Sequence, residues 1–174
     1  MQNYDLEKYD FSRNIILAWP VGVGKTYTAQ KLLSKKPREN ILSVYQITDA
    51  HFKQLVKSNQ LVLRKPEDYG TGLEYYPLEM MRRCEVLLYD DIGVSDTSDA
   101  YIRDLTYVLD ERTNKKLPII FTTNLKEKEL TEKLHERIVS RMMMNCDVIA
   151  MTGEDRRKKT SKFYQITSAV WNTD

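Results

Sequence analysis

The sequence predicts an α/β domain in which helices cover both faces of a parallel five-stranded sheet. Short apolar runs rich in β-branched residues alternate with segments whose apolar residues recur at helical spacing. This alternation is typical of strand–helix–strand units with right-handed crossovers. Several of the runs end in polar residues, and in such sheets the carboxyl ends of the strands form the usual binding edge.

The first strand is predicted over residues 14–18, which are almost entirely apolar. A helix is predicted over residues 26–35 from its apolar stripe, and Pro37 ends it. The second strand is predicted over residues 41–47, where β-branched and aromatic side chains are frequent.

Thr48 or Asp49 can cap the next helix. Residues 57–72 are predicted to form a loop, with a short strand at 61–63. Pro77 suits the first turn of a helix that runs to residue 83.

The last three strands are predicted over residues 85–89, 117–122 and 146–151. The continuous hydrophobicity of the first of these is typical of a strand buried on both faces of a parallel sheet. A helix ending near Arg112 precedes the fourth strand, and one further helix carries a stripe of Leu130, Leu134 and Ile138.

The turn between the first strand and its helix is predicted to bind phosphate. Glycines let a backbone curl so that its N–H groups point at one centre, and the helix that follows adds its positive dipole end. A lysine at the end of such a loop reaches the β- and γ-phosphates, and the next hydroxyl reaches Mg²⁺. An ordinary turn before a helix is the alternative. The residues assigned to the nucleotide are Pro20, Val21, Gly22, Val23, Gly24, Lys25, Thr26 and Tyr27.

Trp19 departs from this motif, because the first position of the Gly-x-x-x-x-Gly-Lys-Ser/Thr pattern is normally glycine. A tryptophan there is strained if its φ is positive, and it can cover the loop or the adenine if its φ is negative. A third hypothesis is that the residue is glycine in the native protein. The source organism would then read a stop-type codon as glycine, whereas another translation table writes the same codon as tryptophan. The mass of the native protein decides this last hypothesis.

Asp90 and Asp91 follow four apolar residues at the end of the third predicted strand. A carboxylate at this place can hold Mg²⁺ against the phosphates together with Thr26, so Asp90 is assigned to the metal. Asp91 is then placed to orient the attacking water. The alternative is a plain turn that closes the strand.

Three further polar residues are candidates for the same chemistry. Asn124 ends the fourth predicted strand and can contact the γ-phosphate or the water, although an asparagine turn is an alternative. Arg137 and Arg141 lie four apart on one helical face. They either form solvated pairs with Glu132 or Glu136, or serve as an arginine finger for the ATP of a neighbouring subunit.

Composition excludes several classes of protein. Charged residues make up 30% of the 174 residues and the net charge is +2, so no overall field favours nucleic acid or a membrane. No stretch is apolar enough to span a bilayer, and the N-terminus lacks a secretory pattern. The two cysteines are far apart in sequence, which favours reduced thiols in a cytoplasmic protein.

Taken together, the motifs resemble those of AAA+ ATPases, and within them the DnaC- and DnaI-type helicase loaders and the IstB transposition helpers. The segments that carry the resemblance are 21–26, 88–93, 119–125, 136–142 and 153–157. The resemblance implies that Asn124 is sensor 1, that Arg141 is a finger acting in trans with Arg137 in support, and that Arg157 is sensor 2. It also implies ATP-dependent oligomers that bind single-stranded DNA and a replicative helicase or a transposase.

On this basis residues 14–162 are expected to form the AAA+ domain, between a short extension (1–13) and a tail (163–174). The helicase-binding domain and the helical lid of larger relatives are expected to be missing or minimal. An ATPase that remodels a partner on DNA is the favoured function. A nucleotide-binding switch with little turnover and a small-molecule kinase are the alternatives, but adjacent acids and a strand-end asparagine suit water activation better than transfer to a hydroxyl.

Overall fold

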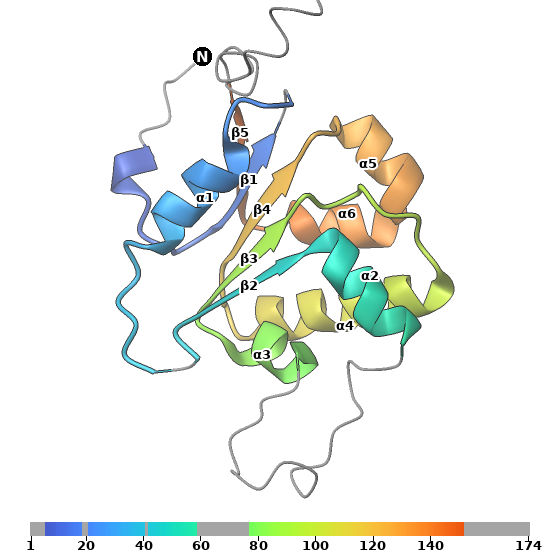
Figure 1. The fold of residues 1–174 in the computed structure, drawn as a ribbon, viewed down its shortest axis with the longest axis horizontal. Coiled ribbons are helices and arrows are strands. Elements are labelled where there is room, and N and C mark those ends of the chain that lie inside the picture. The colour runs from blue at the N-terminus through green and yellow to red at the C-terminus, as the bar shows by residue number, and fades with distance from the viewer. Residues whose placement is uncertain (1–5, 19–20, 41, 59–76, 152–174) are drawn as a thin grey trace, which may run out of the picture.

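The computed structural model describes residues 6–18, 21–40, 42–58 and 77–151. Five parallel strands form one sheet in the order β2-β3-β4-β1-β5. This order places β1 and β3 on either side of β4, so that three strand ends relevant to the predicted site are neighbours (Figure 1). The strands are β1 (Asn14–Ala18), β2 (Val44–Thr48), β3 (Val86–Asp90), β4 (Ile119–Thr123) and β5 (Cys146–Ala150).

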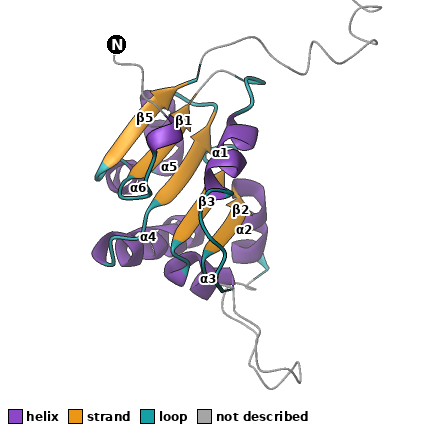
Figure 2. Cartoon of the chain, turned by 90° about the vertical axis from the view of Figure 1, so that its left-hand side faces the viewer, coloured by secondary structure: helices purple, strands orange, loops and turns teal. Residues whose placement is uncertain are grey.

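Helices cover both faces of the sheet, as predicted, but unequally (Figures 1 and 2). One face packs against α1 (Lys25–Leu33) and the short 3-10 helix Leu6–Lys8. The opposite face packs against the remaining helices, which are α2 (Asp49–Lys57), α3 (Pro77–Arg83), α4 (Asp99–Asn114), α5 (Glu127–Leu134) and α6 (Glu136–Met142). Among the described residues, no helix combines the length and the hydrophobicity needed to cross a membrane.

All five residues of β3 are buried, which confirms the prediction that this apolar run lies inside the sheet, and all five residues of β4 are buried as well. Alternate side chains of β1 enter different cores: Ile16 joins the large cluster under α4 and α6, whereas Ile15 and Leu17 join the cluster under α1. Because these central strands are packed on both faces, polar groups can meet solvent only at the strand ends.

Several element boundaries differ from the prediction. β2 begins at Val44 rather than at residue 41, and β4 begins at Ile119 rather than at 117. The helix predicted from Leu130, Leu134 and Ile138 is two helices, α5 and α6, separated by His135 with φ 72°. All three apolar residues are nevertheless buried, so the stripe continues across the break. The short strand predicted at 61–63 lies outside the described residues.

The break at His135 has a local cause. Its ring Nδ1 accepts a hydrogen bond from the backbone N–H of Arg137, at 3.3 Å, and so caps the start of α6. A positive φ is uncommon for residues other than glycine, although histidine is among those that adopt it more often. Apolar spacing alone does not reveal such a break, since the buried positions on either side keep helical periodicity.

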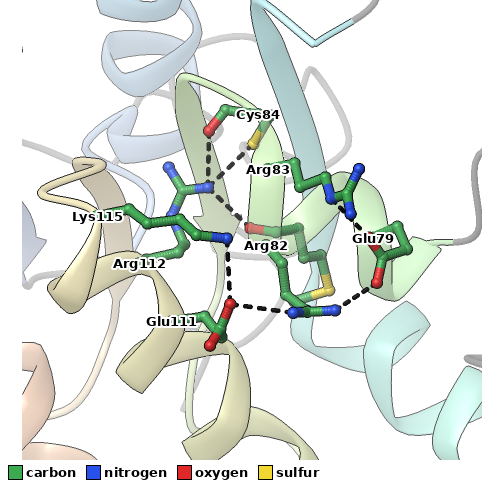
Figure 3. Close-up of polar contacts among 8 residues, drawn as sticks. Glu79, Arg82, Arg83, Cys84, Glu111, Arg112 and Lys115 are labelled. Carbon is green, nitrogen blue, oxygen red and sulfur yellow. Dashed lines mark hydrogen bonds and ion pairs between the residues drawn. The ribbon is translucent and has the colours of Figure 1, made fainter.

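Among the described residues, Arg112 of α4 is the largest fully buried side chain. It binds backbone at the end of α3 (Figure 3) and also backbone just before β4. Its Nη1 donates to the carbonyl oxygens of Met81 and Cys84, both at 2.8 Å, and its Nη2 donates to the carbonyl oxygen of Pro118 at 2.7 Å. Burial lowers the pKa of Arg112. The guanidinium therefore satisfies backbone carbonyls at the end of α3 that would otherwise lack donors.

A chain of ion pairs lies outside this buried group (Figure 3). Glu111 accepts from Arg82 at 3.0 Å and from Lys115 at 3.1 Å, and Arg82 also pairs with Glu79. The Arg82 guanidinium stands 4.6 Å from the centre of the Tyr107 ring. These contacts join the outer faces of α3 and α4, and their partial exposure limits the stability that they add.

Candidate functional site

The carboxyl ends of β1, β3 and β4 border an open pocket of about 350 Å³. Residues from three separate parts of the chain meet there: the glycine-rich loop, Asp91 directly after β3 and Asn124 directly after β4. The lining residues are Val21, Gly22, Gly24, Lys25, Thr26, Tyr27, Asp91 and Asn124. The structure thus brings together in one pocket most of the residues that the sequence assigned to the nucleotide and to catalysis.

The loop has the backbone that its glycines permit. Gly22 and Gly24 have φ values of 80° and 91°, in the left-handed region that other residues rarely adopt. Between them, Val23 turns inward and is buried. Gly24 is also the N-cap residue of α1. Because glycine has no side chain, it forms no side-chain hydrogen bond to the first N–H groups of this helix. Such a helix end favours an anion.

Asp90, Thr26 and Thr122 form a hydrogen-bonded group beside the pocket. Asp90 is buried, and its Oδ1 accepts from Thr26 Oγ1 at 3.0 Å and from Thr122 Oγ1 at 2.5 Å. The Thr26 hydroxyl and the Asp90 carboxylate are oxygen ligands of the kind that Mg²⁺ uses together with phosphates and water. Within the described part of the chain, no group of three or more His, Cys, Asp or Glu residues is placed to hold a metal ion. A Mg²⁺ ion at Thr26 and Asp90 would therefore need phosphate and water oxygens as further ligands.

Thr122 is a site residue that the sequence analysis did not single out. Besides donating to Asp90, its Oγ1 accepts the backbone N–H of Asp91 at 2.8 Å. One hydroxyl of β4 therefore fixes both acids at the end of β3. The available signal was its place in the Thr-Thr-Asn triplet at the end of a buried strand, where a polar side chain needs a partner.

The turn after Asp91 is fixed against β4. Asp91 has a φ of 57°, and the N–H of Ile92 donates to the carbonyl oxygen of Thr122 at 2.9 Å. Gly93 has a φ of 88°, and a Cβ placed there would lie 2.8 Å from Leu125 Cδ1. The positive φ explains why glycine is favoured here, and the Leu125 side chain would have to move to make room for a Cβ.

Arg137 and Arg141 do not line this pocket. Arg141 forms a two-pronged ion pair with Asp110 of α4, in which its Nε contacts one oxygen and its Nη2 lies 3.2 Å from the other. Its Nη1 also donates to the carbonyl oxygen of Arg137 at 3.0 Å. Arg141 therefore does form an ion pair, but its acidic partner is Asp110 on another helix and not Glu132 or Glu136.

Arg137 lines a different groove from the phosphate pocket. It lines an open groove of about 530 Å³ along α4, together with Asp99, Tyr107 and His135. Pro20, Trp19 and Arg157 lie outside the described residues.

The sheet order, the glycine loop that opens α1 and the strand-end acid bonded to the loop threonine define a P-loop protein of the AAA+ class. The model of the family described as IstB-like ATP binding protein matches residues 5–163. The chain belongs to this family.

Individual relatives agree with this class. The chain is 31% identical over 121 residues to the chromosomal replication initiator protein DnaA of Treponema pallidum, a match that covers 70% of this chain and 24% of that protein. It is 27% identical over 107 residues to the ATP-binding protein of insertion sequence IS1162 from Pseudomonas fluorescens, covering 62% of this chain and 42% of the relative. The chain thus spans less than half the length of these relatives.

Solved structures show the same fold. The DnaI structure superposes with a TM-score of 0.65 at 22% identity and covers 87% of this chain and 78% of that one. The DnaC helicase loader gives a TM-score of 0.61 at 21% identity, with 84% of both chains covered. AMPPCP-bound DnaA from Aquifex aeolicus gives 0.63 at 19% identity, covering 97% of this chain and 54% of that one.

Proposed function

We propose that the chain binds MgATP in the pocket between the glycine loop, Asp91 and Asn124, and hydrolyses it slowly. The hydrogen bond from Thr26 to Asp90 is the observation that carries this proposal, because it places the two Mg²⁺ ligands of a P-loop site together. Lys25 would neutralise the β- and γ-phosphates, Asp91 would orient the attacking water, and Asn124 would sense the γ-phosphate. Bound Mg²⁺ would supply charge neutralisation between the phosphates.

The hydrolytic site is proposed to be completed by a second subunit. No arginine is among the residues that line the pocket in the described part of the chain. A phosphoryl-transfer transition state gains much from an arginine supplied in trans. Arg141, supported by Arg137, is the proposed finger, and an assembly of subunits would bring it to the neighbour's ATP. In cis, Arg157 is the proposed sensor 2.

The work done with this ATP is proposed to be the remodelling or loading of another protein on single-stranded DNA in the cytoplasm. Structural relatives named as a helicase loader and as a replication initiator bound to AMPPCP and single-stranded DNA support this proposal. The insertion-sequence relative supports the second candidate, a helper ATPase for a transposase. Copurification from the native host decides between them: a replicative helicase supports the first candidate, and a transposase supports the second.

Lys25→Ala should lower Mg-dependent ATP hydrolysis about 10²-fold or more, because it removes a charge that faces the transferred phosphate. Hydrolysis is measured as phosphate release, with and without single-stranded DNA. Lys31→Ala is the matched control, since Lys31 lies on the same helix with a side chain 60% exposed and paired with Glu7. Equal rates in Lys25→Ala and in the parent chain would contradict the proposed function.

A further inference from the structure

Asp49 is a fully buried carboxylate that the proposed chemistry does not use. It is the first residue of α2, but it does not cap this helix, because Thr48 takes that role by accepting the N–H of His51 at 3.2 Å. The Asp49 side chain is therefore available for contacts with other elements. Its described hydrogen-bond partners are all neutral donors, and a buried carboxylate costs free energy unless such bonds offset it.

Two buried phenols bind one oxygen of this carboxylate. Tyr89 donates to Asp49 Oδ1 at 3.0 Å, Tyr101 donates to the same atom, and the two phenol oxygens lie 3.1 Å apart. Burial raises the pKa of both phenols, so each keeps its proton and remains a donor. Phe52 packs edge-on against both rings, with centroid distances of 5.8 Å and 5.1 Å, which restricts their movement.

The other oxygen of Asp49 holds the loop after the acidic pair. The backbone N–H of Ser95 donates to Asp49 Oδ2 at 2.8 Å. The same loop, residues 91–98, is tied to β4 at Ile92 and to the end of α5 through Thr97, whose Oγ1 donates to the carbonyl oxygen of Lys133 at 3.0 Å. Asp49 thus anchors the middle of a loop whose first residue is Asp91.

Asp49 also contacts the strand that ends in the metal ligand. Tyr89 directly precedes Asp90, and Thr48, the neighbour of Asp49, pairs in register with Asp90. One buried carboxylate therefore connects the last residues of β2 and β3, the start of α4 through Tyr101, and the loop that begins at Asp91.

We propose that Asp49 is a positioning residue for ATP hydrolysis, which fixes loop 91–98 so that Asp91 keeps its orientation toward the phosphate pocket. This inference rests on the proposed function. It assigns to Asp49 an effect on the chemical step and not on nucleotide binding, because Asp49 does not line the pocket while Lys25, Thr26 and the glycine loop do.

The test compares Asp49→Ala with Asp96→Ala in the full chain. Asp96 lies in the same loop with a fully exposed side chain, and it reaches Lys53 only at 3.9 Å. Asp49→Ala should lower kcat about 10-fold or more while KM for ATP changes little, since a misplaced group lowers the rate steeply. The Ser95 amide should exchange its hydrogen faster in Asp49→Ala. Asp96→Ala should match the parent chain in kcat, KM and exchange.

Tyr101→Phe separates positioning from general stability. It removes one donor from Asp49 but leaves the bond to Ser95, so it should lower the unfolding midpoint while kcat stays near the parent value. A parent-like kcat in Asp49→Ala, or an equal loss of kcat in Tyr101→Phe, overturns the proposal. If Asp49→Ala does not fold, Asp49→Asn is measured in the same way. If the parent chain does not hydrolyse ATP, the proposed function is refuted. The exchange of the Ser95 amide still tests the contact made by Asp49, and unchanged exchange in the Asp49 variant overturns the inference.

Discussion

Arg141→Ala should lower ATP hydrolysis by the assembled protein about 10³-fold or more, because a finger arginine neutralises charge only in the transition state. ATP affinity should stay close to that of the parent chain, since Arg141 does not line the pocket of its own subunit. Phosphate release above the concentration at which the protein assembles measures the first effect. Titration with ATP measures the second.

The ion pair with Asp110 provides the matched control. Asp110→Asn removes the charge that holds Arg141 in the isolated chain but keeps the arginine. If the loss in Arg141→Ala came only from the broken ion pair, Asp110→Asn would reproduce it. The proposed role requires instead that Asp110→Asn retain hydrolysis.

Mixing two inactive variants tests whether the finger acts in trans. In a mixed assembly, a Lys25→Ala subunit still carries Arg141, and an Arg141→Ala subunit still carries an intact pocket. The mixture should therefore recover part of the activity that each variant lacks alone. Absence of any recovery in assemblies that contain both variants would contradict a role in trans.

Arg112→Met should destabilise the fold by about 3–5 kcal/mol, because the loss of a buried charged donor leaves its partners uncompensated. The carbonyl oxygens of Met81, Cys84 and Pro118 would keep their burial without these bonds. Methionine keeps much of the volume, so the loss would report mainly on hydrogen bonding. Urea unfolding measures it as a lower midpoint at an unchanged slope.

Arg103→Met is the control for this second large effect. Arg103 lies on the same helix with a side chain 73% exposed, and its ion-pair partner among the described residues is its neighbour Asp104. Its replacement should change the free energy of unfolding by less than about 0.5 kcal/mol. If Arg112→Met does not fold, Arg112→Lys is measured in its place. Because lysine keeps the charge, the free energy of unfolding of Arg112→Lys should lie below that of Arg103→Met by less than the full loss expected for Arg112→Met. Equal stability of Arg112→Met and Arg103→Met would show that the buried guanidinium does not hold α3 to β4.

The architecture and the pocket could be predicted because they depend on local patterns. The burial of β3 follows from its uninterrupted apolar run, and the meeting of Gly24, Asp91 and Asn124 follows from strand ends that share one edge of a parallel sheet. The positive φ values at Gly22 and Gly24 are likewise what a phosphate loop requires.

Apart from the local helix break at His135, the main features that escaped prediction depend on contacts distant in sequence. Asp49 reads as a helix cap because an acidic residue at a helix start is ordinary, and nothing local indicates that Tyr89 and Tyr101 surround it. Arg112 reads as a favourable cation in the last turn of a helix. Asp110 stands 31 residues before Arg141, so their pairing depends on how α4 packs against α6.

Isothermal titration of the chain with ATP, with and without Mg²⁺, tests most directly whether the pocket beside Lys25 and Asp91 is a nucleotide site. We expect one nucleotide per chain, an affinity that falls when Mg²⁺ is withdrawn, and a large loss of affinity in Lys25→Ala but not in Lys31→Ala. No binding heat from a folded parent chain across several temperatures, or equal affinity in the parent and Lys25→Ala, would contradict it.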